Sequence, residues 1–181
     1  PTLERADVIG WFDRDQLISQ VAIYPMRVRI FNQTYDMGGV TGVGTYPEYA
    51  NQGLMHKLLI EALKHMKNHN QPISYLYPYS IPYYRRKGWE IVSDKIVYEI
   101  NDYQLPKHRR VSGEVERVDA ESEEIKKAYE RFAYQTHGAL LRDDLAWNEY
   151  FLWDSDDLMA AIYYNEAGFA DGYILYFIKD E

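Results

Sequence analysis

The sequence predicts a mixed α/β fold with a central, mostly antiparallel sheet that contains one parallel pair of strands. Three observations support this prediction. Short apolar runs separated by turns fill residues 8–46, which is typical of an antiparallel meander. Apolar side chains then repeat at helical spacing through residues 54–66. A further apolar run at residues 73–77 completes the order strand, helix, strand, which makes the two flanking strands parallel neighbours.

The meander is expected to contain four short strands. Turn residues Asp13-Arg14-Asp15 and Asn32-Gln33 separate the runs, and apolar and charged side chains alternate from Arg27 to Ile30, as in a half-buried strand. The predicted strands cover Val8 to Phe12, Leu17 to Tyr24, Arg27 to Phe31 and a part of Tyr35 to Tyr46.

The predicted helix has an apolar face and a charged face. Asn51 is its expected N-cap, and the segment from Asn68 to Pro72 ends it. A second, short helix is expected from Ile81 to Arg86, ending at Gly88, and Ile91 to Ile100 has strand character. The apolar face of the first helix consists of Leu54, Met55, Leu58, Leu59, Ala62, Leu63 and Met66.

The rest of the chain predicts part of a second, similar domain. Two helices are expected at residues 121–134 and 144–151, and a hairpin joins 158–164 to 171–178 around Asn165-Glu166-Ala167-Gly168. That hairpin resembles the one at residues 8–24. The predicted domains are therefore 1–104 and 114–181, joined by a linker at 105–113 that contains Pro106, a basic run at 107–110 and Gly113.

Composition excludes several classes of protein. The 181 residues are 46% hydrophobic and contain no cysteine, so disulfides, thiolate metal sites and cysteine nucleophiles are excluded. The longest apolar runs are about seven residues, too short for a membrane span, and the charged N-terminal segment does not match a signal peptide. We expect a cytoplasmic protein. Because the sequence does not begin with Met, we also expect it to be a part of a longer chain.

Charge is divided unevenly along the chain. Residues 1–110 carry 14 lysines and arginines against 11 acidic residues, whereas residues 111–181 carry 6 against 17, which gives the overall net charge of −8. A nucleic-acid partner is disfavoured, because such proteins present a basic surface. The acidic half either attracts cationic small molecules and basic peptides or simply solvates a helix face.

The glycine-rich stretch from Gly38 to Leu54 is the first candidate for chemistry. A strand passes through Pro47 into a loop and enters a helix near Gly53. The first turn of a helix has unpaired N–H groups, and a glycine there lets a phosphate approach the backbone. The stretch is neither a Walker A loop nor a dinucleotide fingerprint. It is either a pyrophosphate site or a plain turn in which Gly53 relieves crowding.

The second candidate is the segment from Ser80 to Trp89. It follows the parallel strand, so it brings the phenol of Tyr84 to the carboxyl end of the sheet, where ligands of such sheets gather. The alternative is that Tyr84 is one of 18 tyrosines and packs in the core.

Together the two segments resemble the GNAT superfamily of acetyl-CoA-dependent N-acetyltransferases. More narrowly, Val43-x-Thr45-x-Pro47, Gly53-Leu54-Met55 and the run from Tyr84 to Trp89 are similar to the enhanced intracellular survival (Eis) family. The resemblance implies a GNAT-like mixed sheet with helices on both faces, followed by the start of a second, degenerate GNAT-like domain. It also implies a homo-oligomer and acetyl transfer from acetyl-CoA to a primary amine that is aminoglycoside-like, polyamine-like or a lysine.

The resemblance also implies a role for each matched position. Val43, Gly44 and Thr45 would hold the pantetheine arm through their backbone, and Asn51, Gln52, Gly53, Leu54 and Met55 would surround the pyrophosphate. Tyr79 or Ser80 would line the arm near the thioester, and Tyr84 would be the general acid for the departing thiolate. Two positions depart from the family pattern. Ala50 replaces a basic residue, and Met55 replaces a small one.

Several alternatives stay open. The resemblance implies that the general base is a terminal carboxylate from a domain outside this sequence, and Glu48 and Asp36 are the substitutes within it. Instead of an enzyme, the chain could be a non-catalytic CoA-binding module or a structural half of an oligomer. His65 and His69 have a spacing that can bind metal, but no third ligand is near them in sequence, so we expect no metal.

Overall fold

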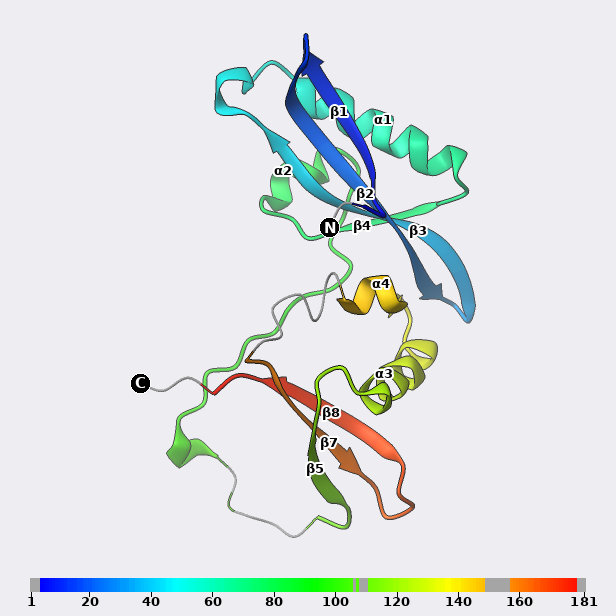
Figure 1. Ribbon diagram of the computed structural model, residues 1–181, viewed down its shortest axis with the longest axis vertical. Helices are drawn as coiled ribbons and strands as arrows, with labels where there is room; N and C mark the ends of the chain where they lie inside the picture. The colour runs from blue at the N-terminus through cyan, green and yellow to red at the C-terminus, as the bar shows by residue number, and fades with distance from the viewer. Residues whose placement is uncertain (1–3, 106, 108–110, 149–156, 179–181) are drawn as a thin grey trace. The chain divides into compact units, whose positions relative to one another are not determined.

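The structure is a computed structural model that describes residues 4–105, 107, 111–148 and 157–178 (Figure 1). The chain divides into two compact units. The first unit consists of residues 1–92 together with 137–141, and the second of residues 93–136 together with 142–181.

A five-stranded mixed sheet forms the centre of the first unit, so the predicted mixed α/β fold is confirmed. Its order is β1-β2-β3-β4; β1 to β3 are antiparallel, and β4 is parallel to β3. A short strand, β6, pairs with β2 beyond the end of β1. The strands are β1 (Asp7–Asp13), β2 (Gln16–Ile30), β3 (Gln33–Thr45), β4 (Ile73–Leu76) and β6 (Leu140–Leu141).

Strand β2 is continuous where the sequence predicted two strands. It runs through Pro25, whose missing N–H would normally interrupt a central strand. On one edge of β2, β1 pairs as far as Ile23 and β6 pairs from Arg27. Pro25 falls in the gap between these two partners, so no ladder hydrogen bond is lost there.

The turn between β2 and β3 is displaced by one residue from the predicted position. Phe31 and Asn32 have φ values of 44° and 62°, and the ladder closes directly on either side with Ile30 opposite Gln33. Positive φ at both central residues is the signature of a two-residue type I′ hairpin turn. Asn32 suits this conformation, and Phe31 accepts it in an exposed position.

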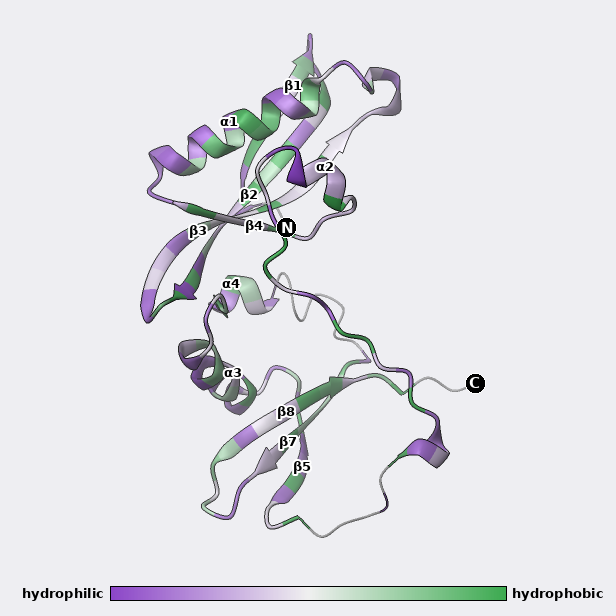
Figure 2. Cartoon of the chain, turned by 180° about the vertical axis from the view of Figure 1, so that it is seen from behind, coloured by the Kyte–Doolittle hydropathy of each residue, from purple (hydrophilic) through white to green (hydrophobic). Residues whose placement is uncertain are grey.

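Helix α1 (Leu54–Asn68) covers the sheet with its apolar face (Figure 2). Its N-cap is Gly53 in the left-handed conformation, not the predicted Asn51, which is itself left-handed and lies in the loop before the helix. Because α1 packs on β1, β2 and β3, its buried side chains form one core with the sheet. That core contains Val21, Ile23, Val40, Leu58, Leu59, Ala62, Met66 and Tyr84.

The segment after the short helix α2 (Ile81–Arg85) differs from the prediction. Gly88, with φ of 101°, ends this region as expected. Residues 91–100 form no strand, because no other strand of the described chain pairs with them. Their apolar side chains are consequently exposed, and Val97 retains 79% of its accessible surface.

The second unit contains a three-stranded antiparallel sheet in the order β5-β7-β8. The predicted hairpin is confirmed as β7 (Met159–Tyr164) and β8 (Ala170–Tyr176). Strand β5 (Glu114–Val118) was not predicted, because three of its five residues are charged. The side chains of Ile125 and Trp147 pack with Ala160 and Ile162 of β7 in its core.

Two helices belong to the second unit. Helix α3 (Glu123–Gln135) matches the first prediction, and the Ser122 side chain caps it by accepting from the N–H of Glu124. Helix α4 (Asp144–Ala146) covers the start of the second, whose residues 149–151 lie outside the described residues. The predicted linker contains residues 106 and 108–110, which also lie outside them, and a short 3-10 helix, Asp102–Gln104, precedes it. No helix in the described ranges is long and apolar enough to cross a membrane.

Candidate active site

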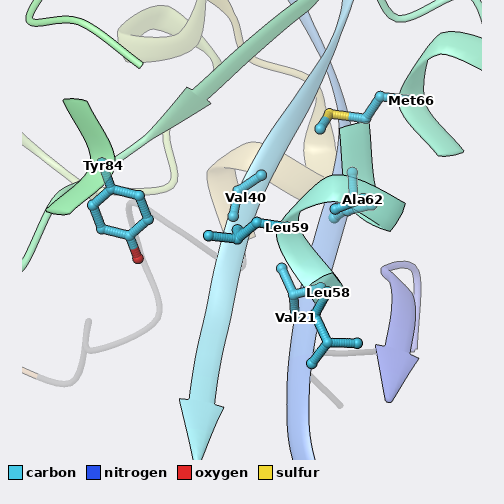
Figure 3. Close-up of a cluster of buried hydrophobic side chains, with 8 residues drawn as sticks. Val21, Val40, Leu58, Leu59, Ala62, Met66 and Tyr84 are labelled. Atoms are coloured by element: carbon cyan, nitrogen blue, oxygen red, sulfur yellow. The ribbon is translucent and has the colours of Figure 1, made fainter. Parts of the chain in front are cut away.

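Strands β3 and β4 pair over only part of their length and then diverge. The parallel ladder joins Met37–Val40 to Ile73–Leu76. Beyond it β3 continues from Thr41 to Thr45 with β2 as its only partner among the described residues. In Figure 3 the green arrow of β4 ends near Tyr84, whereas the light-cyan strand β3 runs on past Tyr84 in another direction. One edge of β3 is therefore open along its last residues, with unpaired backbone groups.

A β-bulge bends β3 at the start of this open edge. The register shifts between Gln20 and Ala22 of β2, so Gly42 and Val43 together face Val21. Gly42 has φ of 55°, and a Cβ built there would lie 3.3 Å from the Cβ of Ala22. Glycine is needed at this position both for the backbone conformation and for the close approach.

The buried hydroxyl of Ser19 holds the end of β3. It donates a hydrogen bond of 3.1 Å to the carbonyl of Gly44 and lies 2.7 Å from the hydroxyl of Thr45. The next residue, Tyr46, donates its N–H to the carbonyl of Ile18. Because alternate residues of a strand direct their N–H groups to opposite edges, the N–H of Thr45 points to the open edge.

The loop between β3 and α1 turns twice through left-handed residues. It contains a short 3-10 helix, Pro47–Tyr49, which is tied to the β1–β2 turn because the Tyr49 hydroxyl donates to Asp13 over 3.0 Å. Asn51 has φ of 62° and Gly53 φ of 77°. A Cβ on Gly53 would meet nothing within 4 Å, so the backbone conformation, not crowding, accounts for this glycine.

The start of α1 keeps its backbone donors available. No side chain of the described residues caps the helix, and the first helix N–H groups have no partner within the helix. The space in front of Gly53 is open. These donors can therefore bind an anion.

Tyr84 lies next to the opening, where α2 positions its ring. The Tyr84 side chain is 4% exposed, and Figure 3 shows it beside Val40 of β3 and Leu59 of α1. Edge-on contacts with the rings of Tyr79, Tyr83 and Trp89, at 5.3–6.1 Å between centroids, fix its orientation. Burial raises the pKa of Tyr84, and the neighbouring phenols of Tyr79 and Tyr83 raise it further. The phenol is thus kept protonated.

The remaining predicted site residues fall into two groups. Asn51, Gln52 and Tyr79 are exposed, and Ser80 is the half-buried N-cap residue of α2. The side chain of Leu54 is buried and that of Met55 packs against the core. These two can therefore contribute only their backbone N–H groups.

The two candidate bases lie at different places. Glu48 is exposed in the 3-10 helix that follows the open edge of β3. Asp36 lies opposite Arg27, before the ladder with β4 begins. Five to nine residues separate Asp36 from the open edge at Thr41 to Thr45, which corresponds to about 17–30 Å at the usual rise of a strand. Asp36 is therefore too far away to act at the opening.

Ser19 and a contact between Lys87 and His56 were not predicted from the sequence. Leaving tyrosine and tryptophan aside, Ser19 is the only buried residue with a polar side chain among the described residues, and it interrupts an apolar run of β2. That interruption was a usable signal. The Nζ of Lys87 lies 2.8 Å from the Nδ1 of His56, but the two residues are 31 positions apart, and no sequence pattern connects them.

The described residues contain no group of three side chains that could hold a metal ion. The rings of His65 and His69 stack at 4.1 Å between centroids. The Nε2 of His65 lies 2.9 Å from a carboxylate oxygen of Asp7, so this pair links α1 to β1.

Comparison with known proteins identifies the family. The family model of the GNAT acetyltransferase domain matches residues 1–92. No curated protein matches the chain. Similar solved structures are a probable N-acyltransferase of Enterococcus faecalis V583 (29% identity, TM-score 0.82), a GCN5-related N-acetyltransferase of Anabaena variabilis (24%, 0.73) and Eis1 of Mycobacterium abscessus (22%, 0.77).

The likeness extends over nearly all of this chain but not over all of the similar proteins. The chain is covered to 98%, 93% and 97%, respectively, and it spans 46%, 43% and 46% of those structures, about half of their length. The domain model matches the part of the chain that contains strands β1 to β4 of the mixed sheet and the open edge of β3. This chain belongs to the GNAT acetyltransferase family.

Proposed function

We propose that this protein transfers an acetyl group from acetyl-CoA to a primary amine, with Tyr84 as the general acid. The observation that carries the proposal is the open edge of β3 next to the buried phenol of Tyr84. Family membership supports acyl transfer in general, and the similarity to a probable N-acyltransferase at 29% identity agrees with it.

In this proposal the pantetheine arm of acetyl-CoA lies along the open edge of β3 like an additional strand. The backbones of Val43 and Thr45 supply the hydrogen bonds. The carbonyl of Gly44 accepts from Ser19, so this residue serves to hold the strand in place. The diphosphate lies at Gly53, where the N–H groups of Leu54 and Met55 begin the helix.

The reaction then requires two proton transfers. The neutral amine attacks the thioester carbonyl, which forms the C–N bond, and the C–S bond breaks when the tetrahedral intermediate collapses. Tyr84 donates its proton to the departing sulfur, and the amine loses its proton to a base. A raised pKa suits Tyr84 for this role, because the phenol remains protonated until the thiolate forms. Glu48 is the candidate base at this end of the sheet.

The acceptor is an aminoglycoside-like, polyamine-like or lysine amine. All three are cationic, and residues 111–181 are strongly acidic, which favours such acceptors. We further propose a cytoplasmic homo-oligomer, in agreement with the absence of cysteine.

A second candidate function is a CoA-binding module without catalysis. It is favoured by Ala50, Asn51 and Gln52, because none of them neutralises a phosphate. A thiol-release assay on the full-length protein separates the two candidates. Acetyl-CoA is offered with an aminoglycoside, a polyamine and a lysine peptide, and Tyr84→Phe is compared with Tyr83→Phe.

If the protein is an acetyltransferase, we expect thiol release that depends on the amine. Tyr84→Phe should abolish this release, and Tyr83→Phe should largely retain it. Saturable CoA binding without thiol release supports the binding module instead. If the wild-type protein neither binds CoA nor releases thiol, both functions are wrong.

A further inference from the structure

We propose that Lys87 and His56 form a phosphate-binding pair that selects phosphorylated acyl carriers over simple pantetheine thioesters. The inference rests on the proposed function and adds to it the source of positive charge. Ala50, Asn51 and Gln52 carry no positive charge to neutralise the phosphates. In this inference two residues outside the loop supply that charge.

The two side chains come from different elements. His56 lies in the first turn of α1, and Lys87 follows α2. Their contact, 2.8 Å from Nζ to Nδ1, joins the two elements. A lysine ammonium can only donate, so the His56 Nδ1 accepts and the imidazole is neutral with its proton on Nε2. The pair therefore presents the remaining N–H groups of Lys87 and the Nε2–H of His56 as donors.

The charge of Lys87 is not neutralised by a neighbouring carboxylate. Three other cations of the described chain have acidic partners: Lys64 pairs with Glu61, Arg85 with Glu90 and Lys126 with Glu123. Lys87 makes no ion pair with any described residue and lies over the ring of Tyr83, 5.6 Å from its centroid. A positive charge that is positioned by a neutral imidazole and an aromatic face is suited to bind an anion.

The location of the pair agrees with the proposed path of the cofactor. Side chains of a helix lean toward its N-terminus, so the ring of His56 lies over the turn that starts at Gly53. The first turn of α1 contains no acidic residue. On the other side, Lys87 is three residues from Tyr84, whose hydroxyl is assigned to the thioester end. The pair thus joins the first turn of α1 to the end of α2, the two elements that carry the proposed diphosphate site and Tyr84.

Titration calorimetry on the full-length protein tests the inference with CoA, dephospho-CoA and pantetheine. The variants are Lys87→Gln and His56→Gln, and Lys67→Gln in the last turn of α1 is the matched control. Lys67 is exposed, and eleven residues of helix separate it from His56, about 17 Å.

We expect Lys87→Gln to weaken CoA binding about tenfold, the effect of one charge-assisted contact at a partly exposed site, and His56→Gln to weaken it about threefold. Binding of pantetheine should be unchanged in both variants, and Lys67→Gln should stay within about twofold of the wild type. If the loss caused by Lys87→Gln disappears with dephospho-CoA, the pair binds the 3′-phosphate. If the loss persists, the pair binds the diphosphate.

Two results overturn the inference while the proposed function stands. One is that the wild-type protein binds CoA and the Lys87→Gln variant binds it with the same affinity. The other is an equal loss in Lys87→Gln and Lys67→Gln, which would reflect net charge alone. Failure of the wild-type protein to bind CoA at all overturns the proposed function, and this inference with it.

Discussion

The hydroxyl of Ser19 on β2 donates to the carbonyl of Gly44 on β3, at the point where β3 has lost β4 as a partner. Beyond that point β2 is the only strand partner of β3 among the described residues, and the Ser19 side chain adds hydrogen bonds to this pairing. Since Ser19 is 2% exposed, its hydroxyl is shielded from water and would be costly to leave without a hydrogen bond. A buried side chain of β2 therefore holds the end of the open edge in place.

Replacing Ser19 by alanine is expected to destabilise the protein by about 1–2 kcal/mol, because Gly44 and Thr45 lose a buried hydrogen-bond partner. The KM for acetyl-CoA should rise, while the KM for the amine stays the same, since only the strand that binds the thioester is loosened. Chemical denaturation and steady-state kinetics measure the two effects. Thr34→Ala, on an exposed part of β3, is the control and should change the stability by less than about 0.5 kcal/mol.

Replacing Gly42 by alanine is expected to cost about 1–2 kcal/mol of stability, because a side chain at φ of 55° is strained and its Cβ would press on Ala22. Gly44→Ala is the matched control two residues further on. A Cβ there meets nothing within 4 Å, and its φ is not positive. Equal unfolding midpoints for the two variants would show that the bulge at Gly42 is not required.

The pH dependence of the reaction follows from the raised pKa of Tyr84. A general acid must be protonated, so activity should be lost as the pH rises through that pKa, and the alkaline limb should lie above the ordinary value of 10.0. Tyr79→Phe removes one of the groups that raise the pKa, so its alkaline limb should shift to lower pH. Profiles of kcat against pH, recorded for the wild type and for Tyr79→Phe, measure the two alkaline limbs. An alkaline limb that Tyr79→Phe leaves in place would contradict the coupling between the two phenols.

Much of the fold could be predicted, because it depends on local periodicity. The helix at Leu54–Asn68, the parallel pair of strands around it and the hairpin of β7 and β8 all follow from the spacing of apolar residues. The failures have tertiary causes. Residues 91–100 have the composition of a strand but no partner in the described chain, and β5 forms with little apolar character because β7 supplies its hydrogen bonds.

The candidate site could be predicted only in part, for the same reason. The loop with Gly53 and the segment with Tyr84 are contiguous in sequence, so their patterns could be found. The Ser19–Gly44 hydrogen bond spans 25 residues and the contact between Lys87 and His56 spans 31. Such pairs depend on the register of the sheet and on the packing of two helices, which a single sequence does not reveal.

Tyr164 of β7 donates a hydrogen bond to the carboxylate of Glu124 on α3, and this contact raises the pKa of Tyr164 to about 12. A pKa that is raised in the folded state contributes stability below the unfolded value of 10.0, and this contribution is lost as the pH rises through the folded value. Ultraviolet titration of the phenols should therefore show a group near pH 12 that disappears in Tyr164→Phe. In Glu124→Gln the same phenol should titrate at lower pH, because the negative acceptor is gone. If the titration curve of Glu124→Gln matched that of the wild type, Glu124 would not be the cause of the raised pKa.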